Sequence, residues 1–455
     1  MTAWLVPLIL WIAVTVGARG LLERAGCVRC RAGDWGTAFL AGFTLFTFLV
    51  YAASLLGIRI GGALFCGVAL LVLAGGILAR RGAPSAPKAK EAPWTPAEAL
   101  LALAFLVYAG AVALNALFFP EMSLDAHSYD GRARFLLHDG TLDLALYHWP
   151  GASVQGSTNI TYPPLFSLGL AVGHAFGGWQ SKIVNPFFSV AWPLVVYGAL
   201  RQSIPRFWAL AWTLFLAVTP DVLAHASYAL LNMPAMALTT GEAVALARFV
   251  RYRERRWLFL AALFAAGAAG VRPDAVSVHA ALLLTASVAL LLDRRPREIL
   301  FLGAPALAPL LTWGTWTLYL KLVIGAETLA PAGGEERIGL GKVLHAVRVY
   351  LLSWETYGAT FLAWFPSLLL FWARRNRDGL FFLGASVAVL ASLVTVFSTL
   401  DASYGGGPSE VLSYSFKRSL FYVVPLAGLA AALNPPGIWL AARGRGWIHH
   451  GTSTS

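Results

Sequence analysis

The sequence is poor in charged residues and in cysteine. Only 12% of its 455 residues are Asp, Glu, Lys or Arg and 58% are hydrophobic, whereas an average soluble domain has about 25% charged residues. So few charges cannot cover a solvated surface, and three cysteines cannot build a disulfide scaffold. These scarcities exclude a water-soluble domain, a disordered chain and a disulfide-rich one. They predict a protein whose solvent is lipid.

What the sequence has instead is a series of long apolar runs. A transmembrane helix needs about 20 apolar residues, and continuous runs favour helices over a barrel, whose strands alternate. The runs that reach or approach this length lie at residues 2–18, 36–56, 60–79, 97–119, 183–200, 207–220, 233–250, 257–271, 275–292, 299–320, 346–372, 379–398 and 420–442. The predicted fold class is an all-α polytopic membrane protein with about 13 transmembrane helices.

The net charge of +12 is distributed between the runs and not on one exposed face. Nucleic acid is therefore not an expected partner, whereas anionic lipid headgroups of the bilayer are. If the amino terminus is outside, one set of connections holds about twice as many Lys and Arg as the other, and the positive-inside rule makes that set cytoplasmic. This predicts an integral cytoplasmic (inner) membrane protein with a cytoplasmic carboxyl terminus. The weaker stretch 165–178 should then lie flat at the outer interface.

Two connections suggest the domain organisation. Segment 84–96, rich in Pro, Ala and Lys, reads as a cytoplasmic linker. It would separate N-terminal helices 1–83 from a transmembrane module 97–442, which a cytoplasmic tail 443–455 follows. The loop 120–182, between the fourth and fifth spans, falls on the extracytoplasmic side and should contain short interfacial helices. Loops of this length are usually functional.

The first candidate site is the segment S-L-D-A-H-S-Y-D-G-R-A-R-F-L-L-H-D-G at the start of this loop. Ser123 or Asp125 can cap a short helix that Gly140 ends, which places Asp125, Tyr129 and Arg132 along one face. A carboxylate at the rim of a membrane cavity is suited to remove the proton of an acceptor hydroxyl. The alternative is that Asp125 only caps the helix.

Positive charge forms the second candidate site. Arg272 lies in V-R-P-D between two apolar runs, and Lys417 and Arg418 lie in S-F-K-R-S-L-F-Y at the start of the last one. Basic residues at such depth are costly and normally have a partner, and a phosphate whose charge develops during a reaction is a suitable one. The alternatives are a structural pair of Arg272 with Asp274, and lipid-headgroup anchoring for Lys417 and Arg418.

Other polar residues give weaker signals. Asp125 and His127 could share a divalent metal, but two ligands do not define a site, and no cofactor is firmly implied. Glu242 and His279 fall within apolar runs. They could join two helices by a hydrogen bond, or carry ions or protons as in transporters.

The loop motif carries a resemblance to a known group. Asp125, Tyr129, Arg132 and Arg134, as D-x-x-x-Y-x-x-R-A-R, resemble the first extracytoplasmic loop of GT-C superfamily glycosyltransferases, the group of protein O-mannosyltransferases and aminoarabinose transferases. In that group the acid follows the end of a span and a Pro-Pro-Leu motif closes a long loop. This chain has Tyr-Pro-Pro-Leu at 162–165. The resemblance extends over about residues 97–433.

This resemblance implies a sugar donor carried on a polyprenyl phosphate. It also implies an inverting transfer on the extracytoplasmic face, with Asp125 as the general base, to a hydroxyl of a glycan, lipid or protein acceptor. Together with the basic residues above, the expected donor-binding set is Tyr129, Arg132, Tyr162, Arg272, Lys417 and Arg418.

The sequence departs from this group at two positions. Tyr162 stands where aminoarabinose transferases have a phosphate-binding Lys before Pro-Pro. Asn232 stands where the family often has a second acid, and Asp221 is the nearest acid on that turn. A second catalytic acid or a metal site is therefore not expected.

Two other functional classes remain open. A secondary transporter or lipid flippase would normally show inverted repeats and interrupted midplane helices, and the sequence has no convincing internal repeat. A ligase of the O-antigen type would share the membrane setting but use a diphosphate-linked glycan.

Overall fold

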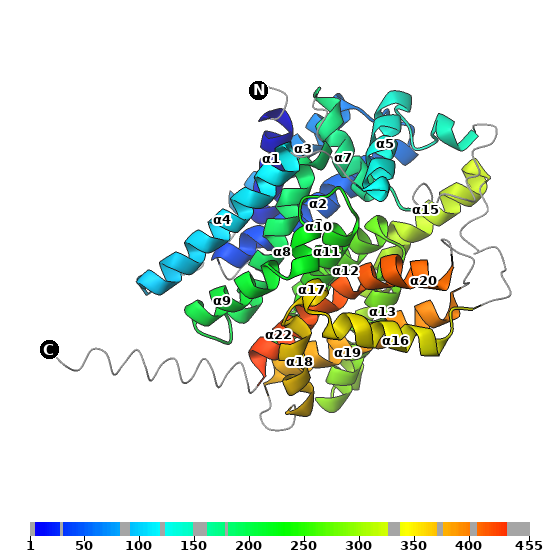
Figure 1. The fold of residues 1–455 in the computed structure, drawn as a ribbon. Helices are drawn as coiled ribbons and strands as arrows, with labels where there is room; N and C mark the ends of the chain where they lie inside the picture. The colour runs from blue at the N-terminus through cyan, green and yellow to red at the C-terminus, as the bar shows by residue number, and fades with distance from the viewer. Residues whose placement is uncertain are drawn as a thin grey trace.

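The computed structural model describes residues 5–27, 31–81, 92–118, 123–148, 162–177, 181–325, 337–370, 376–400 and 407–434, and these residues form helices joined by turns (Figure 1). The helices of ten or more residues are α1 (Leu5–Arg24), α2 (Arg31–Leu55), α3 (Gly62–Arg81), α4 (Pro96–Phe118), α5 (Leu124–Asp139), α7 (Leu165–Ala175), α8 (Asn185–Leu200), α9 (Arg206–Ala217), α11 (Asn232–Tyr252), α12 (Arg256–Val271), α13 (Ala275–Leu292), α16 (Leu340–Leu352), α18 (Thr360–Leu369), α19 (Arg377–Thr399) and α22 (Val423–Leu433). The shorter ones are η2 (Ala145–His148), η3 (Ser181–Val184), α10 (Pro220–His225), η4 (Pro296–Leu302), α14 (Gly303–Leu307), η5 (Ala308–Leu311), α15 (Trp313–Tyr319), η6 (Leu320–Ile324), α17 (Trp354–Tyr357), α20 (Pro408–Glu410), η7 (Val411–Phe416), α21 (Lys417–Ser419) and η8 (Leu420–Tyr422).

Nine helices or helix series within these ranges are long and apolar enough to cross a membrane. The chain is therefore an integral multi-pass membrane protein. The predicted count of thirteen is not confirmed. Two expected spans form the shorter helices α9 and α12, of 12 and 16 residues. Helix α11 has 21 residues, but Thr239, Thr240 and Glu242 interrupt its apolar character.

Two of the predicted spans have different limits in the structure. The run at 346–372 is divided into α16, α17 and α18, because Ser353 is extended and Gly358 has φ 54°. The run expected at 420–442 belongs to a helix series that already begins at Pro408, and its described part ends at Leu433. The predicted tail 443–455 and most of the predicted linker 84–96 lie outside the described residues.

Glycines allow the first three helices to pack closely. A Cβ atom built on Gly20 of α1 would lie 2.2 Å from the carbonyl oxygen of Gly76 in α3, and one on Gly33 of α2 would lie 2.5 Å from Cα of Gly198 in α8. Backbones in lipid gain van der Waals contact by such small-residue approaches. The N-terminal helices thus pack directly onto the helices that follow, and a domain boundary near residue 83 stays a prediction.

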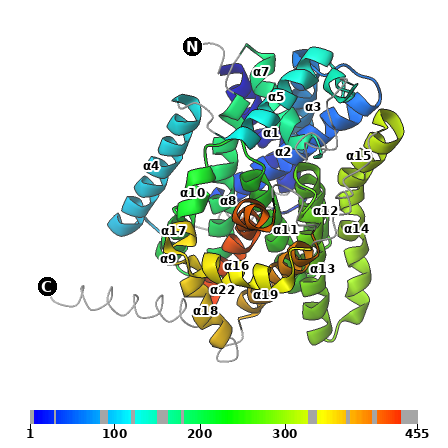
Figure 2. The same ribbon diagram turned by 45° about the vertical axis from the view of Figure 1, so that its right-hand side comes forward.

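Helices α11 and α22 form much of the core, since nearly all of their residues are buried. Glu242 of α11 and His279 of α13 lie within this core and form an ion pair whose Nδ1 and Oε1 atoms are 2.5 Å apart. The interpretation of these two residues as a link between helices is therefore confirmed. Helix α4 lies at one flank of the bundle, whereas α5 and α7 lie together at one end (Figure 2).

The stretch predicted to lie flat at the membrane interface forms helix α7, which neighbouring helices cover. Every residue from Leu165 to Gly173 in α7 is buried, and the helix packs against α5 and α2. Eleven apolar residues are too few for a span, and the predicted place of this helix at the outer interface stays a prediction.

Candidate functional site

Helix α5 presents the predicted catalytic acid. Gly140 has φ 70° and ends the helix as expected, because its left-handed backbone favours glycine. Ser123 makes no side-chain cap, so the helix does not begin with the predicted capping bond. Asp125 lies in the first turn with its side chain 35% exposed, and the charge of a carboxylate is favourable at this end of a helix.

Asp125 contacts Arg418 directly. The Nη1 atom of Arg418 donates to Oδ2 of Asp125, which joins α5 to α21 across 293 positions in the sequence. The guanidinium of Arg418 also stands 5.3 Å from the ring centroid of Tyr414, which belongs to the π-helical turn η7. π-Helical turns are rare in proteins, and those that occur are often found at functional sites. The structure thus brings the predicted base and one predicted phosphate ligand together.

Arg272 is held by a dense set of polar partners. Its Nε and Nη2 atoms donate to Asp274 over 2.9 and 2.6 Å, and Nη1 donates to Asn232. Arg272 and Asp274 therefore form the ion pair that the alternative interpretation predicts. Burial lowers the pKa of Arg272, but the charge of Asp274 and the neighbouring tyrosines outweigh burial and raise the pKa above its ordinary value. Arg272 consequently stays charged.

Asp274 also connects Arg272 to the segment that carries Arg418. Ser419 donates to its Oδ2 over 3.1 Å and Tyr422 donates to its Oδ1 over 3.0 Å. One carboxylate therefore accepts hydrogen bonds from the hairpin between α12 and α13 and from the last helix series. This fixes the position of one predicted cation relative to the other.

Tyr129 lies close to both the acid and the cations. Its ring is stacked on Tyr162 at 6.4 Å between centroids and packs edge-on against Phe166. Burial raises the pKa of Tyr129 well above 10, and its hydroxyl is within electrostatic range of Asp125, Arg272 and Arg418. Tyr129 is therefore a neutral hydroxyl at the centre of the site.

Arg132 lies on the same face of α5 as Tyr129, three residues further along the helix. It is buried, its Nη1 atom donates to the Tyr162 carbonyl oxygen over 2.5 Å, and its guanidinium stands 5.0 Å from the ring centroid of Trp316 in α15. These contacts place Arg132 beside Tyr162 and join α5 to α15. Arg132 therefore anchors α5.

Lys417 takes a different partner from Arg418. Its Nζ atom lies 3.0 Å from Oδ1 of Asp221 in α10, and its carbonyl oxygen accepts from the Tyr357 hydroxyl. Sequence reasoning noted Asp221 only as the acid nearest to Asn232 and did not anticipate this pair. The signal was present, because Asp221 follows Pro220 at the start of a short helix on a turn with few other charges.

Metal ligation has little support at this site. Within the part of the chain that the structure describes, no group of three or more His, Cys, Asp or Glu side chains could hold a metal ion. His127 is exposed on α5, whereas Asp125 faces Arg418.

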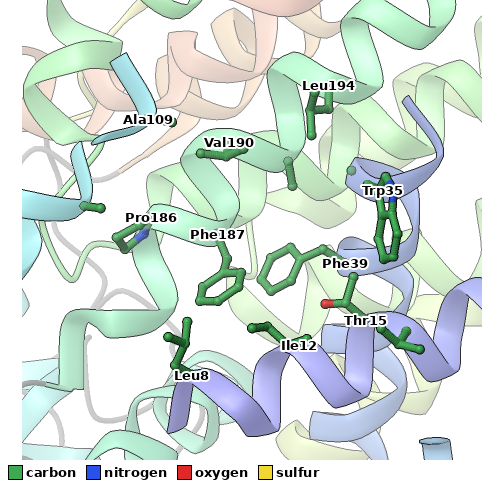
Figure 3. A pocket seen from close by; sticks show the side chains of 14 residues that line it. Leu8, Ile12, Thr15, Trp35, Phe39, Ala109, Pro186, Phe187, Val190 and Leu194 are labelled. Atoms are coloured by element: carbon green, nitrogen blue, oxygen red, sulfur yellow. The ribbon is translucent and has the colours of Figure 1, made fainter. Parts of the chain in front are cut away.

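An apolar groove of about 420 Å³ lies between α1, α2, α4 and α8 (Figure 3). Phe39 and Phe187 stack within it at 5.3 Å between centroids, and Leu8, Ile12 and Val190 extend its apolar surface. The N-terminal helices thus form one wall of a groove suited to a hydrocarbon chain.

Comparison with known proteins shows similarity in structure but not in sequence. No family model and no curated protein matches the chain. The fold is similar to that of ArnT from Cupriavidus metallidurans, a GT-C aminoarabinose transferase whose crystal structure was determined bound to undecaprenyl phosphate. The TM-score is 0.52 and the sequence identity 15%, over 76% of this chain and 63% of that chain. The chain therefore spans less than two-thirds of ArnT, and the predicted GT-C resemblance is confirmed as a shared fold.

Proposed function

We propose that this chain is a membrane glycosyltransferase that moves a sugar from a polyprenyl phosphate to an acceptor hydroxyl on the extracytoplasmic face. The observation that carries the proposal is the contact of Asp125 with Arg418, next to the network of Arg272 and Asp274. It unites an acid and fixed cations at one site of an ArnT-like fold. Undecaprenyl phosphate, the ligand bound to ArnT, supports a donor of the same class.

In the proposed reaction, the acceptor oxygen attacks the anomeric carbon of the sugar while Asp125 takes its proton. The bond between that carbon and the phosphate oxygen breaks, and the electron pair leaves with the polyprenyl phosphate. A single displacement of this kind inverts the anomeric centre. Arg418 and Arg272 stabilise the charge that develops on the leaving phosphate, and Lys417 adds to the positive field.

The ion pair of Asp125 and Arg418 has a specific part in this scheme. Its two side chains are 35% and 20% exposed, so solvent or a ligand can reach the pair. The donor phosphate, a diester with one negative charge, can therefore compete with Asp125 for Arg418. Donor binding would free the carboxylate for the acceptor hydroxyl, so that the base becomes available only when the donor is in place.

The experiment that tests this function uses the purified full-length protein with a panel of polyprenyl-phosphate sugars. Release of free polyprenyl phosphate together with a new glycoside supports the proposal. If a substrate crosses proteoliposome membranes in a gradient-dependent way, with no change in its covalent structure, the chain is a transporter instead.

A further inference from the structure

A second groove, of different chemistry, opens between α16 and the start of the last helix series. Its volume is about 740 Å³, which falls within the roughly 300–1,000 Å³ of small-molecule sites. The side chains that define its character are Lys342, His345, Val349, Tyr350, Ser409 and Leu412.

The polarity of this groove changes along α16. Lys342 and His345 are exposed on its first turns, whereas Val349 and Tyr350 line it two turns later. Lys342 and Tyr350 are therefore roughly 12 Å apart along the helix axis. Just before Lys342, the amides of Ile338 and Gly339 donate to carbonyl oxygens at the end of α19 over 3.1 and 3.3 Å. The basic end of the groove thus lies at the carboxyl-terminal end of α19.

The groove lies beside the helix series that carries Lys417 and Arg418. The Tyr350 hydroxyl is within electrostatic range of Asp221, which forms the ion pair with Lys417. Lys417 directly precedes Arg418, the partner of Asp125. Leu412 in the opposite wall lies on η7, the turn that leads into Lys417. A molecule in this groove would therefore extend toward the reacting groups.

The two grooves of the molecule suit two different ligands. The groove between α1, α2, α4 and α8 is lined almost entirely by apolar side chains, which fits hydrocarbon. The groove along α16 has a cation and an imidazole at one end and is otherwise lined mainly by apolar side chains, which fits an amphipathic molecule with an anionic group. The separation matters because a transferase must hold donor and acceptor together without exchanging their places.

We infer that the groove between α16 and α20–η7 binds the acceptor, and that this acceptor carries a phosphate or carboxylate which Lys342 and His345 recognise. The inference rests on the proposed function and specifies the chemical class of the acceptor, the second substrate of that reaction.

Binding of anionic probes tests the inference without requiring turnover. Full-length protein in phosphatidylcholine nanodiscs is titrated with lysophosphatidylglycerol, with lysophosphatidylcholine and with soluble glycerol 3-phosphate. The wild type should retain the anionic lysolipid about 10-fold more tightly than the zwitterionic one, a difference of about 1.4 kcal/mol. Lys342→Gln combined with His345→Gln should remove that preference. Competition by glycerol 3-phosphate would indicate a water-soluble acceptor, and its absence a lipid-borne one.

Lys321→Gln is the matched control, because Lys321 is exposed in η6 and does not line the groove. It should leave the preference unchanged. Equal loss in Lys321→Gln and in the double variant, or no preference in the wild type, would overturn the inference. If the wild type releases no polyprenyl phosphate under any condition, the proposed function fails, whatever the binding result.

Discussion

Tyr422 donates its hydroxyl hydrogen bond to Asp274 over 3.0 Å, and so links the last helix series to the hairpin that carries Arg272. The same carboxylate receives two hydrogen bonds from Arg272 and one from Ser419. The positions of the two arginines proposed to face the phosphate therefore depend on one acidic side chain.

Asp274→Asn should weaken donor binding. A hydrogen bond to a charged group contributes about 1.5–3 kcal/mol, so the KM for the donor should rise roughly 10- to 100-fold. Tyr422→Phe removes one of these bonds and keeps the charge of Asp274, so it should have a smaller effect. Steady-state kinetics of both variants at varied donor concentration make the comparison. Equal donor KM in Asp274→Asn and the wild type would show that Asp274 does not position Arg272.

Gly20→Ala should destabilise the N-terminal helices. Its Cβ atom would lie 2.2 Å from the Gly76 carbonyl oxygen, so α1 and α3 must separate, at a cost of about 1–3 kcal/mol. Gly67→Ala is the matched control, because a Cβ atom there meets nothing within 4 Å. Thermal unfolding in detergent should show a lower Tm for the first variant only. An unchanged Tm for Gly20→Ala would contradict the close approach of α1 to α3.

His225 should make the protein less stable in acid. Burial lowers the pKa of its imidazole below 6.5, and although Asp221 opposes this effect, Arg418 and Lys417 add to it. The unfolded chain therefore takes up the proton first as the pH falls, so stability is lost below the unfolded pKa of about 6.5. His225→Gln cannot be protonated and should lack this loss.

The comparison is made as the Tm of the wild type minus the Tm of His225→Gln. This difference should be constant above about pH 7 and should fall on acidification to about pH 5.5. A difference that rises toward acid pH would mean that the folded protein stabilises the protonated imidazole.

Three features could be predicted from the sequence: the membrane class, the helix that carries Asp125, and the end of that helix at Gly140. These features depend on composition and local geometry, which short stretches of sequence contain. The span count was less predictable, because Ser353 and Gly358 break one apolar run into three helices. The loss of apolar character at Thr239, Thr240 and Glu242 likewise removes α11 from the helices that qualify by hydropathy.

The candidate site could be predicted as a set of residues but not as a set of contacts. Asp125 and Arg418 are 293 positions apart, and no local pattern indicates that they meet. The π-helical turn η7 before Lys417 has no distinct sequence signal, yet it precedes both cations of α21. Of the two partners of Arg272, the sequence predicts Asp274, which is two residues away. It does not predict Asn232, which is 40 positions away.

The most direct test of the account compares donor binding with turnover in Asp125→Asn. His127→Gln is the control, because His127 is exposed on the same helix, two residues away. Asp125→Asn should bind a polyprenyl-phosphate sugar about as tightly as the wild type, whereas its single-turnover transfer rate should fall roughly 10²- to 10⁴-fold, the usual contribution of a general base. His127→Gln should transfer at the wild-type rate. Transfer by Asp125→Asn at the wild-type rate would contradict the assignment of this carboxylate as the base.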